Sequence, residues 1–555
     1  MFEPPAHHRQ GVHEDTNGNR LYSLAIATTS LLFFAFSLLW AFNSPFFDGP
    51  DESRHINSIS RLVDGGGWPM PYEAVVTGAT HQAELEGSVV VTQDGAVREL
   101  LDPIYRSTLF EYGTSQDKGR DTMLQHPPGY YAVAATVVAA LGGGELRWDH
   151  AQFIVRGVSA AIVAGAIPFI VGTVRRVTRS RLIGILGGVG LLCVPFFTGL
   201  GGYASNDTLL LLACSATMYL LVRGVREARP SAWLLPLAGV AYGVALFTKG
   251  FALMLAPTVV ILAFWVAWRR RRSVLHFVVQ LLVPAAIAFA IGGWWWARNL
   301  LLLGKIQPSQ LGDRERHENA FSGYDFGRFV GAFFERLNGT FWGRNLLPAE
   351  VVTIAGVALI FVLIVALLTR QTRSMFFITA LFPLLIAATI FNNAHGIYWD
   401  TSDPSRGVQG RYLFGGIVAV AIAIGACWLL ILRRASTRAR SILTMVGVAA
   451  PVAITAVCLP FMVSRRWTMF WQTNGIVMET ATWQTNAQHH LALPSWVDAL
   501  VILLATVTAI ATAVLAARLS TTKELFDDAP AATNEQDGAN KKDGAAEQAA
   551  PSVIA

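Results

Sequence analysis

Two adjacent carboxylates and a histidine stand directly after the first long apolar run of the chain. Asp51 and Glu52 follow Pro50, and His55 comes one helical turn after Asp51. Proline suits the first turn of a helix and early acidic residues complement the helix dipole, so we expect a helix here, with Asp51 and His55 on one face. Such a group could act as an acid/base cluster at the lipid–water boundary. The alternative is that these residues are solvated helix caps.

Four further basic residues are candidates for the same site. His126 precedes Pro127-Pro128, Arg298 ends a Trp-rich apolar run, Arg411 precedes a late apolar run, and Lys249 lies among apolar residues. Fixed cations of this kind can bind a phosphate group. The alternative is that each cation is an interfacial anchor whose charged end reaches water. His126 could shape a substrate groove or simply belong to the start of a helix.

The composition identifies a membrane protein. The chain has 555 residues, of which 53% are hydrophobic and only 14% charged, which is typical of a polytopic membrane protein rather than of soluble domains. The net charge of +6 does not indicate nucleic-acid binding, because much of the excess is arginine between apolar runs, as the positive-inside rule requires of cytoplasmic loops.

Apolar runs long enough to cross a bilayer recur along the chain. The first is expected at 21–42, and the others near 151–174, 182–200, 207–222, 232–248, 250–268, 274–296, 350–369, 375–391, 412–432, 441–463 and 496–518. This predicts an all-α fold with about twelve transmembrane helices. The apolar run after Pro128 is short for a span, so we expect an interfacial helix on the outer face. A weak hairpin signal surrounds Asp94-Gly95.

These assignments predict a transmembrane domain at 21–518 between two disordered cytoplasmic tails, 1–20 and 519–555. The extracytoplasmic loops are expected at about 43–150, 297–349, 392–411 and 464–495. The first loop is the largest and should carry interfacial helices. Both termini then lie on the cytoplasmic side, with the basic loops.

The placement of polar residues favours an enzyme. A secondary transporter usually keeps ionisable residues near the bilayer midplane, whereas here Lys249 is the main such residue within a predicted span. A transporter or flippase of lipid-linked glycans remains an alternative, as does a non-catalytic cell-envelope assembly protein. The second of these would tolerate neutral replacement of Asp51 and Glu52.

Four short motifs, in order, give the chain a family resemblance. They are Asp51-Glu52, His126-Pro127-Pro128, Trp294-Trp295-Trp296-Ala297-Arg298-Asn299 and Gln409-Gly410-Arg411-Tyr412. In their order and topology the chain resembles the GT-C superfamily of membrane glycosyltransferases, and bacterial relatives of the protein O-mannosyltransferases in particular. It departs from the latter in the residues after Pro128, and it has no soluble sugar-binding domain, which argues against a protein acceptor.

The resemblance implies transfer of a sugar from a polyprenyl-phosphate carrier to an acceptor on the outer face of a bacterial plasma membrane, with inversion. Asp51 and Glu52 would be the catalytic residues, with Asp51 as the general base and Glu52 positioning substrate or supporting Asp51; the alternative is that Glu52 is the base. His55 and His126 would contact substrate, while Arg298, Arg411 and Lys249 would bind the phosphate. Neither a metal nor another cofactor is implied, and the partners would be the lipid-linked donor, an unidentified acceptor and the bilayer.

Overall fold

The computed structural model describes residues 7–71, 73–87, 89–91, 98–100, 102–109, 119–308, 317–343, 345–473, 487–488 and 490–522. Helix α1 (His7–Asn43) begins within the first predicted tail, so residues 7–20 are helical where the sequence predicted disorder. Residues 1–6, the turn around Asp94-Gly95 and most of the C-terminal tail, 523–555, lie outside the described residues.

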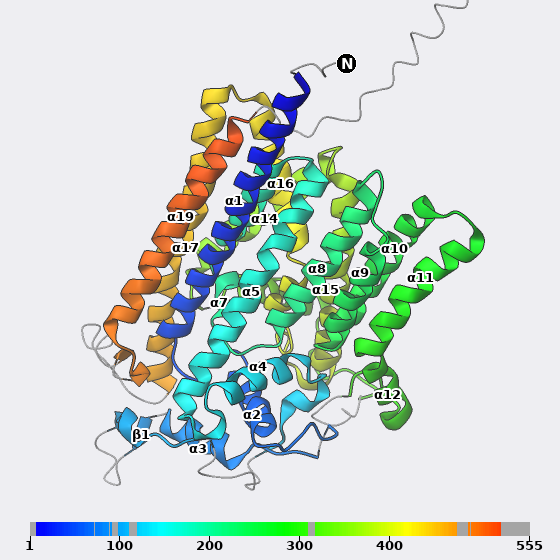
Figure 1. The fold of residues 1–555 in the computed structure, drawn as a ribbon. Coiled ribbons are helices and arrows are strands. Elements are labelled where there is room, and N and C mark those ends of the chain that lie inside the picture. The colour runs from blue at the N-terminus through cyan, green and yellow to red at the C-terminus, as the bar shows by residue number, and fades with distance from the viewer. Residues whose placement is uncertain are drawn as a thin grey trace, which may run out of the picture.

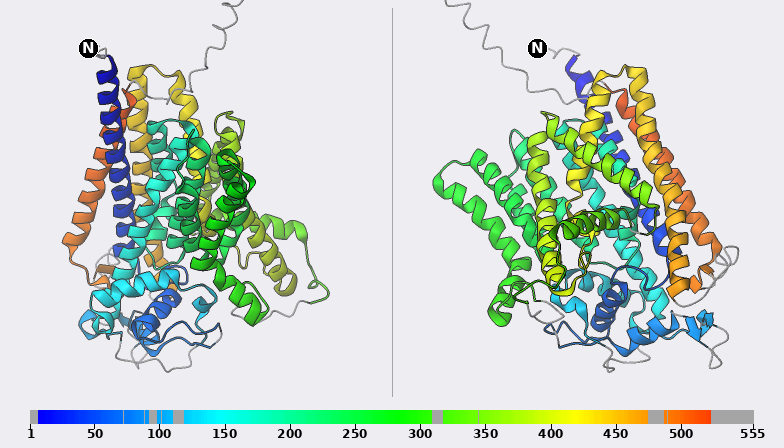
Figure 2. Two further views of the ribbon diagram at one scale, coloured as in Figure 1. Left: turned by 45° about the vertical axis from the view of Figure 1, so that its right-hand side comes forward. Right: turned by 180° about the vertical axis from the view of Figure 1, so that it is seen from behind.

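The molecule is a bundle of long apolar helices (Figures 1 and 2). Besides α1, its main helices are α5 (Trp148–Thr178), α8 (Asp207–Arg226), α10 (Ala256–Arg270), α11 (Val274–Ala288), α14 (Ala349–Leu368), α15 (Arg373–Thr401), α16 (Val418–Arg434), α17 (Thr437–Thr473) and α19 (Ser495–Ser520). In the described residues, nine helices are long and apolar enough to cross a membrane, or up to eleven if two bent pairs each count as one span. The predicted all-α polytopic fold is therefore confirmed.

The count of twelve spans is not confirmed. Helix α9 (Leu234–Leu246) falls in the predicted span 232–248, but it is shorter than a membrane crossing requires. The segment predicted at 182–200 bends by 87° between Arg181–Cys193 and Pro195–Gly201. A helix commonly breaks before proline, because the ring removes a donor and clashes with the preceding turn. The sequence shows how long each apolar run is, but the length does not show where a helix breaks within the run.

The bent pairs contain several short elements. The first consists of α6 (Arg181–Val189), η4 (Gly190–Cys193) and α7 (Pro195–Gly201), and the second pairs η7 (Gly410–Gly416) with α16 at an angle of 71°. Two further short elements continue long helices: η5 (Gly250–Leu255) precedes α10, and the π-helix η6 (Phe289–Gly293) joins α11 to α12 (Trp294–Leu303).

The first predicted loop forms a cap at the end of the bundle opposite the N-terminus (Figure 1). It contains α2 (Glu52–Val63), α3 (Gly78–Glu86), β1 (Val89–Val91), β2 (Arg98–Leu100), η1 (Pro103–Tyr105), η2 (Thr122–Gln125), α4 (Gly129–Ala140) and η3 (Gly143–Glu145). Strands β1 and β2 pair antiparallel, with Val91 opposite Arg98, as the hairpin signal predicted. The short apolar run is the single helix α4, and its position at a membrane interface remains a prediction.

Two other predicted loops contain helical segments. Helix α13 (Phe326–Trp342) lies within 297–349, and α15 continues to Thr401, beyond the predicted span end at 391. Element η7 packs closely against α13, since a Cβ on Gly410 would stand 2.1 Å from the carbonyl oxygen of Leu337. Only glycine permits this approach, which fixes the start of η7 and the position of the next residue, Arg411.

Candidate functional site

The candidate site begins where the chain turns from α1 into α2. Asp51 has φ 58° and ψ 18°, in the left-handed region, and the amide of His55 donates to its carbonyl oxygen at 3.0 Å. Such a backbone is unusual for a residue other than glycine. The predicted helix therefore forms, with Asp51 at its N-cap position, and the backbone bond ties Asp51 to His55.

Arg411 contacts Asp51 directly. Its Nη2 donates to Oδ2 of Asp51 at 2.9 Å, and the side chain of Asp51 is 54% exposed whereas that of Arg411 is only 8% exposed. Burial disfavours the charged carboxylate, but the guanidinium of Arg411 and neighbouring bases outweigh it and hold the pKa of Asp51 below its usual range. The structure thus provides an ionised, accessible carboxylate beside a fixed cation.

Glu52 is engaged in a different way from its neighbour. Its two oxygens accept from Nε and Nη2 of Arg156 at 2.9 and 2.8 Å, and both side chains are fully buried. The amides of Ala204 and Gly49 also donate to the carboxylate, at 3.1 and 3.2 Å. Although burial opposes ionisation, Arg156 and these bonds lower the pKa of Glu52. Both oxygens of Glu52 are therefore occupied by hydrogen bonds within the protein, and its part in catalysis remains a prediction.

Burial lowers the pKa of both predicted site histidines, His55 and His126. Nδ1 of His55 is 3.0 Å from the hydroxyl of Tyr131, which also accepts from Asn206 at 3.2 Å. Burial lowers the pKa of His55 to about 4, so its imidazole is neutral at pH 7. Burial, followed by the charge of Lys249, likewise lowers the pKa of His126. Neither histidine is therefore poised to act as a cation at neutral pH.

Lys249 and Asp207 form a second ion pair near Asp51. Lys249 Nζ donates to Asp207 Oδ1 at 2.6 Å, and lies 4.7 Å from the ring centroid of Tyr412. The positive charge of Lys249 contributes to the low pKa of Asp51. Lys249 therefore belongs to the same cluster, but its charge is already balanced by a carboxylate.

Arg298 has different neighbours. It donates to the sulfur of Met70 and stacks over the ring of Trp295, with 4.8 Å between Cζ and the ring centroid. Its Nη1 is buried without a hydrogen-bond partner among the described residues. The structure thus joins Asp51, His55, Lys249 and Arg411, but the described contacts of Arg298 do not connect it to Asp51.

A cavity of about 190 Å³ lies beside the Asp51–Arg411 pair. Arg336 of α13, Arg411 of η7 and Arg466 of α17 all line it, so three guanidinium groups converge from distant parts of the chain. Arg466 is held in place by Asp48, whose Oδ2 accepts from its Nη1 at 2.6 Å. Arginine recognises phosphate and carboxylate oxygens well, so this cavity can bind an anionic group.

The sequence interpretation missed several of these residues. Arg465 and Arg466 follow the run at 441–463 on the side expected to be poor in basic residues, which was a usable signal. Arg156 falls inside the predicted span 151–174, and an intramembrane charge is a functional or paired residue by default. Asp207 stands at the start of a predicted span. Arg336 gave no signal, because nothing in the sequence links α13 to η7.

The described residues contain no group of three or more His, Cys, Asp or Glu side chains arranged to hold a metal ion. The site contains the carboxylate of Asp51, the imidazole of His55 and the guanidinium groups that line the cavity. Together they can bind an anion and accept a proton beside it.

The fold and the site define a polytopic helical membrane protein with a charged cluster at one end of its bundle. Residues 33–420 match the model of a family described as "Predicted membrane protein (DUF2142)", and the chain belongs to this family. The matched residues include Asp51, Lys249 and Arg298, while Arg411 lies near their end.

Curated relatives match over short stretches. An undecaprenyl phosphate-alpha-4-amino-4-deoxy-L-arabinose arabinosyl transferase from Erwinia tasmaniensis is 35% identical over 120 residues, 21% of each chain. The protein of that name from Aeromonas salmonicida is 30% identical over 143 residues, which are 25% of this chain and 26% of that one. The chain thus matches only about a fifth to a quarter of the length of these relatives.

Solved structures match over more of the chain but less closely. ArnT from Cupriavidus metallidurans, bound to undecaprenyl phosphate, has 15% identity and a TM-score of 0.42, with 88% of this chain and 77% of that chain covered. The Pmt1-Pmt2 protein O-mannosyltransferase complex of S. cerevisiae has 15% identity and a TM-score of 0.34, with 51% and 33% covered.

Proposed function

We propose that this protein is a GT-C type glycosyltransferase that moves a sugar from a polyprenyl-phosphate carrier to an acceptor. The observation that carries the proposal is the 2.9 Å contact between Asp51 and Arg411 beside a cavity that Arg336 and Arg466 also line. A base and a phosphate site side by side are what such a transfer needs. The short matches to arabinosyl transferases support a lipid-phosphate-sugar donor.

The proposed reaction is a single displacement with inversion. The acceptor oxygen attacks the anomeric carbon, the bond from that carbon to the phosphate oxygen breaks, and Asp51 takes the acceptor proton. The departing phosphate gains charge, and Arg411, Arg336 and Arg466 stabilise it, because fixed guanidinium groups do so best in a water-poor site. Glu52 holds the segment around Gly49 so that Asp51 keeps its position.

The donor also has a role in releasing the base. Without a bound donor, Asp51 is paired with Arg411. The phosphodiester of a donor that enters the arginine-lined cavity competes for this guanidinium, because its two unesterified oxygens share one negative charge and accept hydrogen bonds from arginine as a carboxylate does. Asp51 then loses part of its ion pair, and its basicity rises as the donor arrives.

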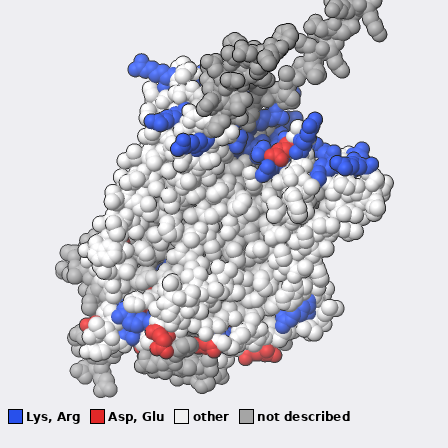
Figure 3. Space-filling model, viewed as in Figure 1, with Lys and Arg blue, Asp and Glu red and all other residues white. Residues whose placement is uncertain are grey.

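The site is proposed to face the extracytoplasmic side. Figure 3 shows that Lys and Arg gather at the end of the molecule that holds the N-terminus, whereas the α2–α4 cap lies at the opposite end. The positive-inside rule assigns the arginine-rich end to the cytoplasm. The cap and Asp51 then lie on the extracytoplasmic face of a bacterial plasma membrane.

A transfer assay tests the proposal. The purified full chain in liposomes is incubated with radiolabelled polyprenyl-phosphate sugars, both hexose and pentose, and with membrane-derived acceptors. Wild type is compared with Asp51→Asn and with the control Asp102→Asn, an exposed N-cap of η1 that keeps its capping ability as asparagine. We expect transfer by wild type and Asp102→Asn but not by Asp51→Asn. Equal transfer by all three proteins would remove Asp51 from the mechanism.

A further inference from the structure

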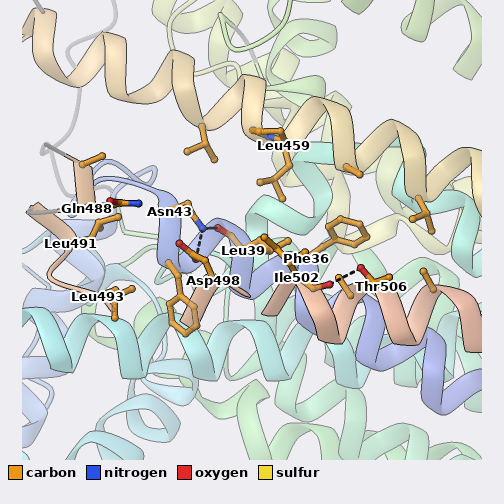
Figure 4. Close-up of a pocket in the computed structure, with 18 of the residues that line it drawn as sticks. Phe36, Leu39, Asn43, Leu459, Gln488, Leu491, Leu493, Asp498, Ile502 and Thr506 are labelled. Carbon is orange, nitrogen blue, oxygen red and sulfur yellow. Dashed lines mark hydrogen bonds between the residues drawn. The ribbon is translucent and has the colours of Figure 1, made fainter. Parts of the chain in front are cut away.

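A second, larger cavity lies within the membrane-spanning bundle, away from the arginine-lined one. It has a volume of about 690 Å³ and lies between α1, α17 and α19, which stand side by side along one flank of the molecule (Figures 1 and 2). Its walls are mainly aliphatic and aromatic, with Phe36, Leu459 and Ile502 among them (Figure 4). Protein interiors leave few voids of this size unfilled, and an apolar one does not hold water well. The cavity therefore suits a hydrocarbon chain.

One end of this cavity is polar. Figure 4 shows Asn43, Asp498 and Gln488 together at that end, with Phe36 and Thr506 towards the other. Asn43 Nδ2 donates to Asp498 Oδ1 at 3.0 Å and to the carbonyl oxygen of Leu39 at 2.9 Å. Both amide hydrogens of Asn43 are thereby used, so its side-chain oxygen and the Asp498 carboxylate offer acceptors, while the amide of Gln488 can both donate and accept. Among the described residues, Asp498 is the one charged residue that lines the cavity, so this end favours a neutral group that donates hydrogen bonds and disfavours a phosphate.

The two cavities therefore differ in charge. Two adjacent residues of α17 line different cavities: Arg466 lines the arginine-lined cavity and Trp467 lines the apolar one. Trp467 also donates from Nε1 to the carbonyl oxygen of Asn43 at 2.8 Å, which holds α17 against the end of α1. An anionic lipid head would meet Asp498 in the apolar cavity and three arginines in the other.

We propose that the α1/α17/α19 cavity is a binding site for a membrane lipid with a hydroxyl-bearing head group that has no net negative charge. Its hydrocarbon chain lies along Phe36, Leu459 and Ile502, and its head group donates hydrogen bonds to Asp498 and Asn43. This site is distinct from the polyprenyl-phosphate site and does not depend on the transfer reaction.

Photocrosslinking tests the proposal. The full chain is placed in phosphatidylcholine nanodiscs with one of three diazirine-bearing probes: a glucosyl diacylglycerol, a phosphatidylglycerol or a polyprenyl phosphate. We expect the glucosyl lipid to label cavity-lining peptides of α1, α17 and α19 about tenfold more strongly than either anionic probe, because facing like charges are penalised. Equal labelling by an anionic probe, or no labelling of these peptides by any probe, overturns the proposal.

Two alanines of α17 give a matched pair of variants. Ala456 lines the cavity whereas Ala453 does not, and both are exposed, so neither change disrupts packing inside the protein. Ala456→Trp should abolish labelling by the glucosyl lipid, and Ala453→Trp should retain it. Equal loss of labelling in both variants overturns the proposal.

Asp498→Asn keeps the cavity and should bring the three probes towards equal labelling. An unchanged preference in that variant contradicts the assigned head group, even if Ala456→Trp does not fold.

Discussion

Arg411 is almost fully buried, yet it donates to the half-exposed carboxylate of Asp51 at 2.9 Å. Its Nε is buried and makes no hydrogen bond among the described residues. The guanidinium thus reaches both the carboxylate and the arginine-lined cavity, with bonding capacity to spare. This single contact connects the proposed base to the proposed phosphate site, and the predictions about transfer follow from it.

Replacing Asp51 should remove the base without disturbing the fold. Asp51→Asn keeps the shape of the side chain and can still accept a hydrogen bond from Arg411, but it cannot take a proton. We expect kcat to fall by about 10²–10⁴-fold. Steady-state transfer kinetics measure this, and an unchanged melting temperature shows that the fold is intact. A variant with wild-type kcat would contradict the assignment.

Replacing Arg336 should weaken donor binding more than it slows chemistry. Arg336→Gln removes one of three guanidinium groups that line the cavity. Loss of a hydrogen bond to the charged phosphate should raise the KM for the donor about tenfold. Arg328→Gln, an exposed change on the same helix α13, is the control and should leave KM unchanged. Equal effects of both variants would indicate a general charge effect rather than a phosphate site.

Replacing Glu52 should destabilise the protein. Glu52→Gln leaves the fully buried Arg156 without its counter-ion, and breaking a buried pair in this way costs about 3–5 kcal/mol. We expect Glu52→Gln to melt at a clearly lower temperature than wild type in detergent. The control Glu145→Gln, an exposed change in η3, should leave the melting temperature unchanged. If Glu52→Gln melts like wild type but transfers no sugar, Glu52 has a chemical role after all.

The sequence predicted the class of fold because apolar runs report membrane helices directly. It also grouped seven candidates in one site, of which the structure brings Asp51, His55, Lys249 and Arg411 together but leaves Arg298 without a described contact to Asp51. It could not assign partners. Asp51 and Glu52 are equivalent by sequence. Only the fold shows that Glu52 pairs with Arg156 and Asp51 with Arg411. The bend before α16, which brings Arg411 to Asp51, depends on close packing that no pattern reports.

The buried imidazole of His55 should make stability depend on pH. Its pKa is about 4 in the folded protein, against 6.5 for the ordinary group. Between these values the unfolded chain binds more protons than the folded one, so the free energy of unfolding falls as the pH drops from 6.5 towards 4. The loss for one such group is at most about 3 kcal/mol. Asp51 stays ionised over most of this window, because its pKa is lowered.

Melting temperatures measured across this pH window test the prediction. His55→Gln keeps a side chain that can bond to Tyr131 but does not titrate. We therefore expect the stability of wild type to decline more steeply than that of His55→Gln as the pH falls. Burial also lowers the pKa of His126, and this residue is present in both proteins. Its contribution to the pH dependence is therefore the same in both, and the difference between the two slopes reports His55 alone. Parallel slopes would mean that His55 is hydrated in the folded protein and takes up its proton freely.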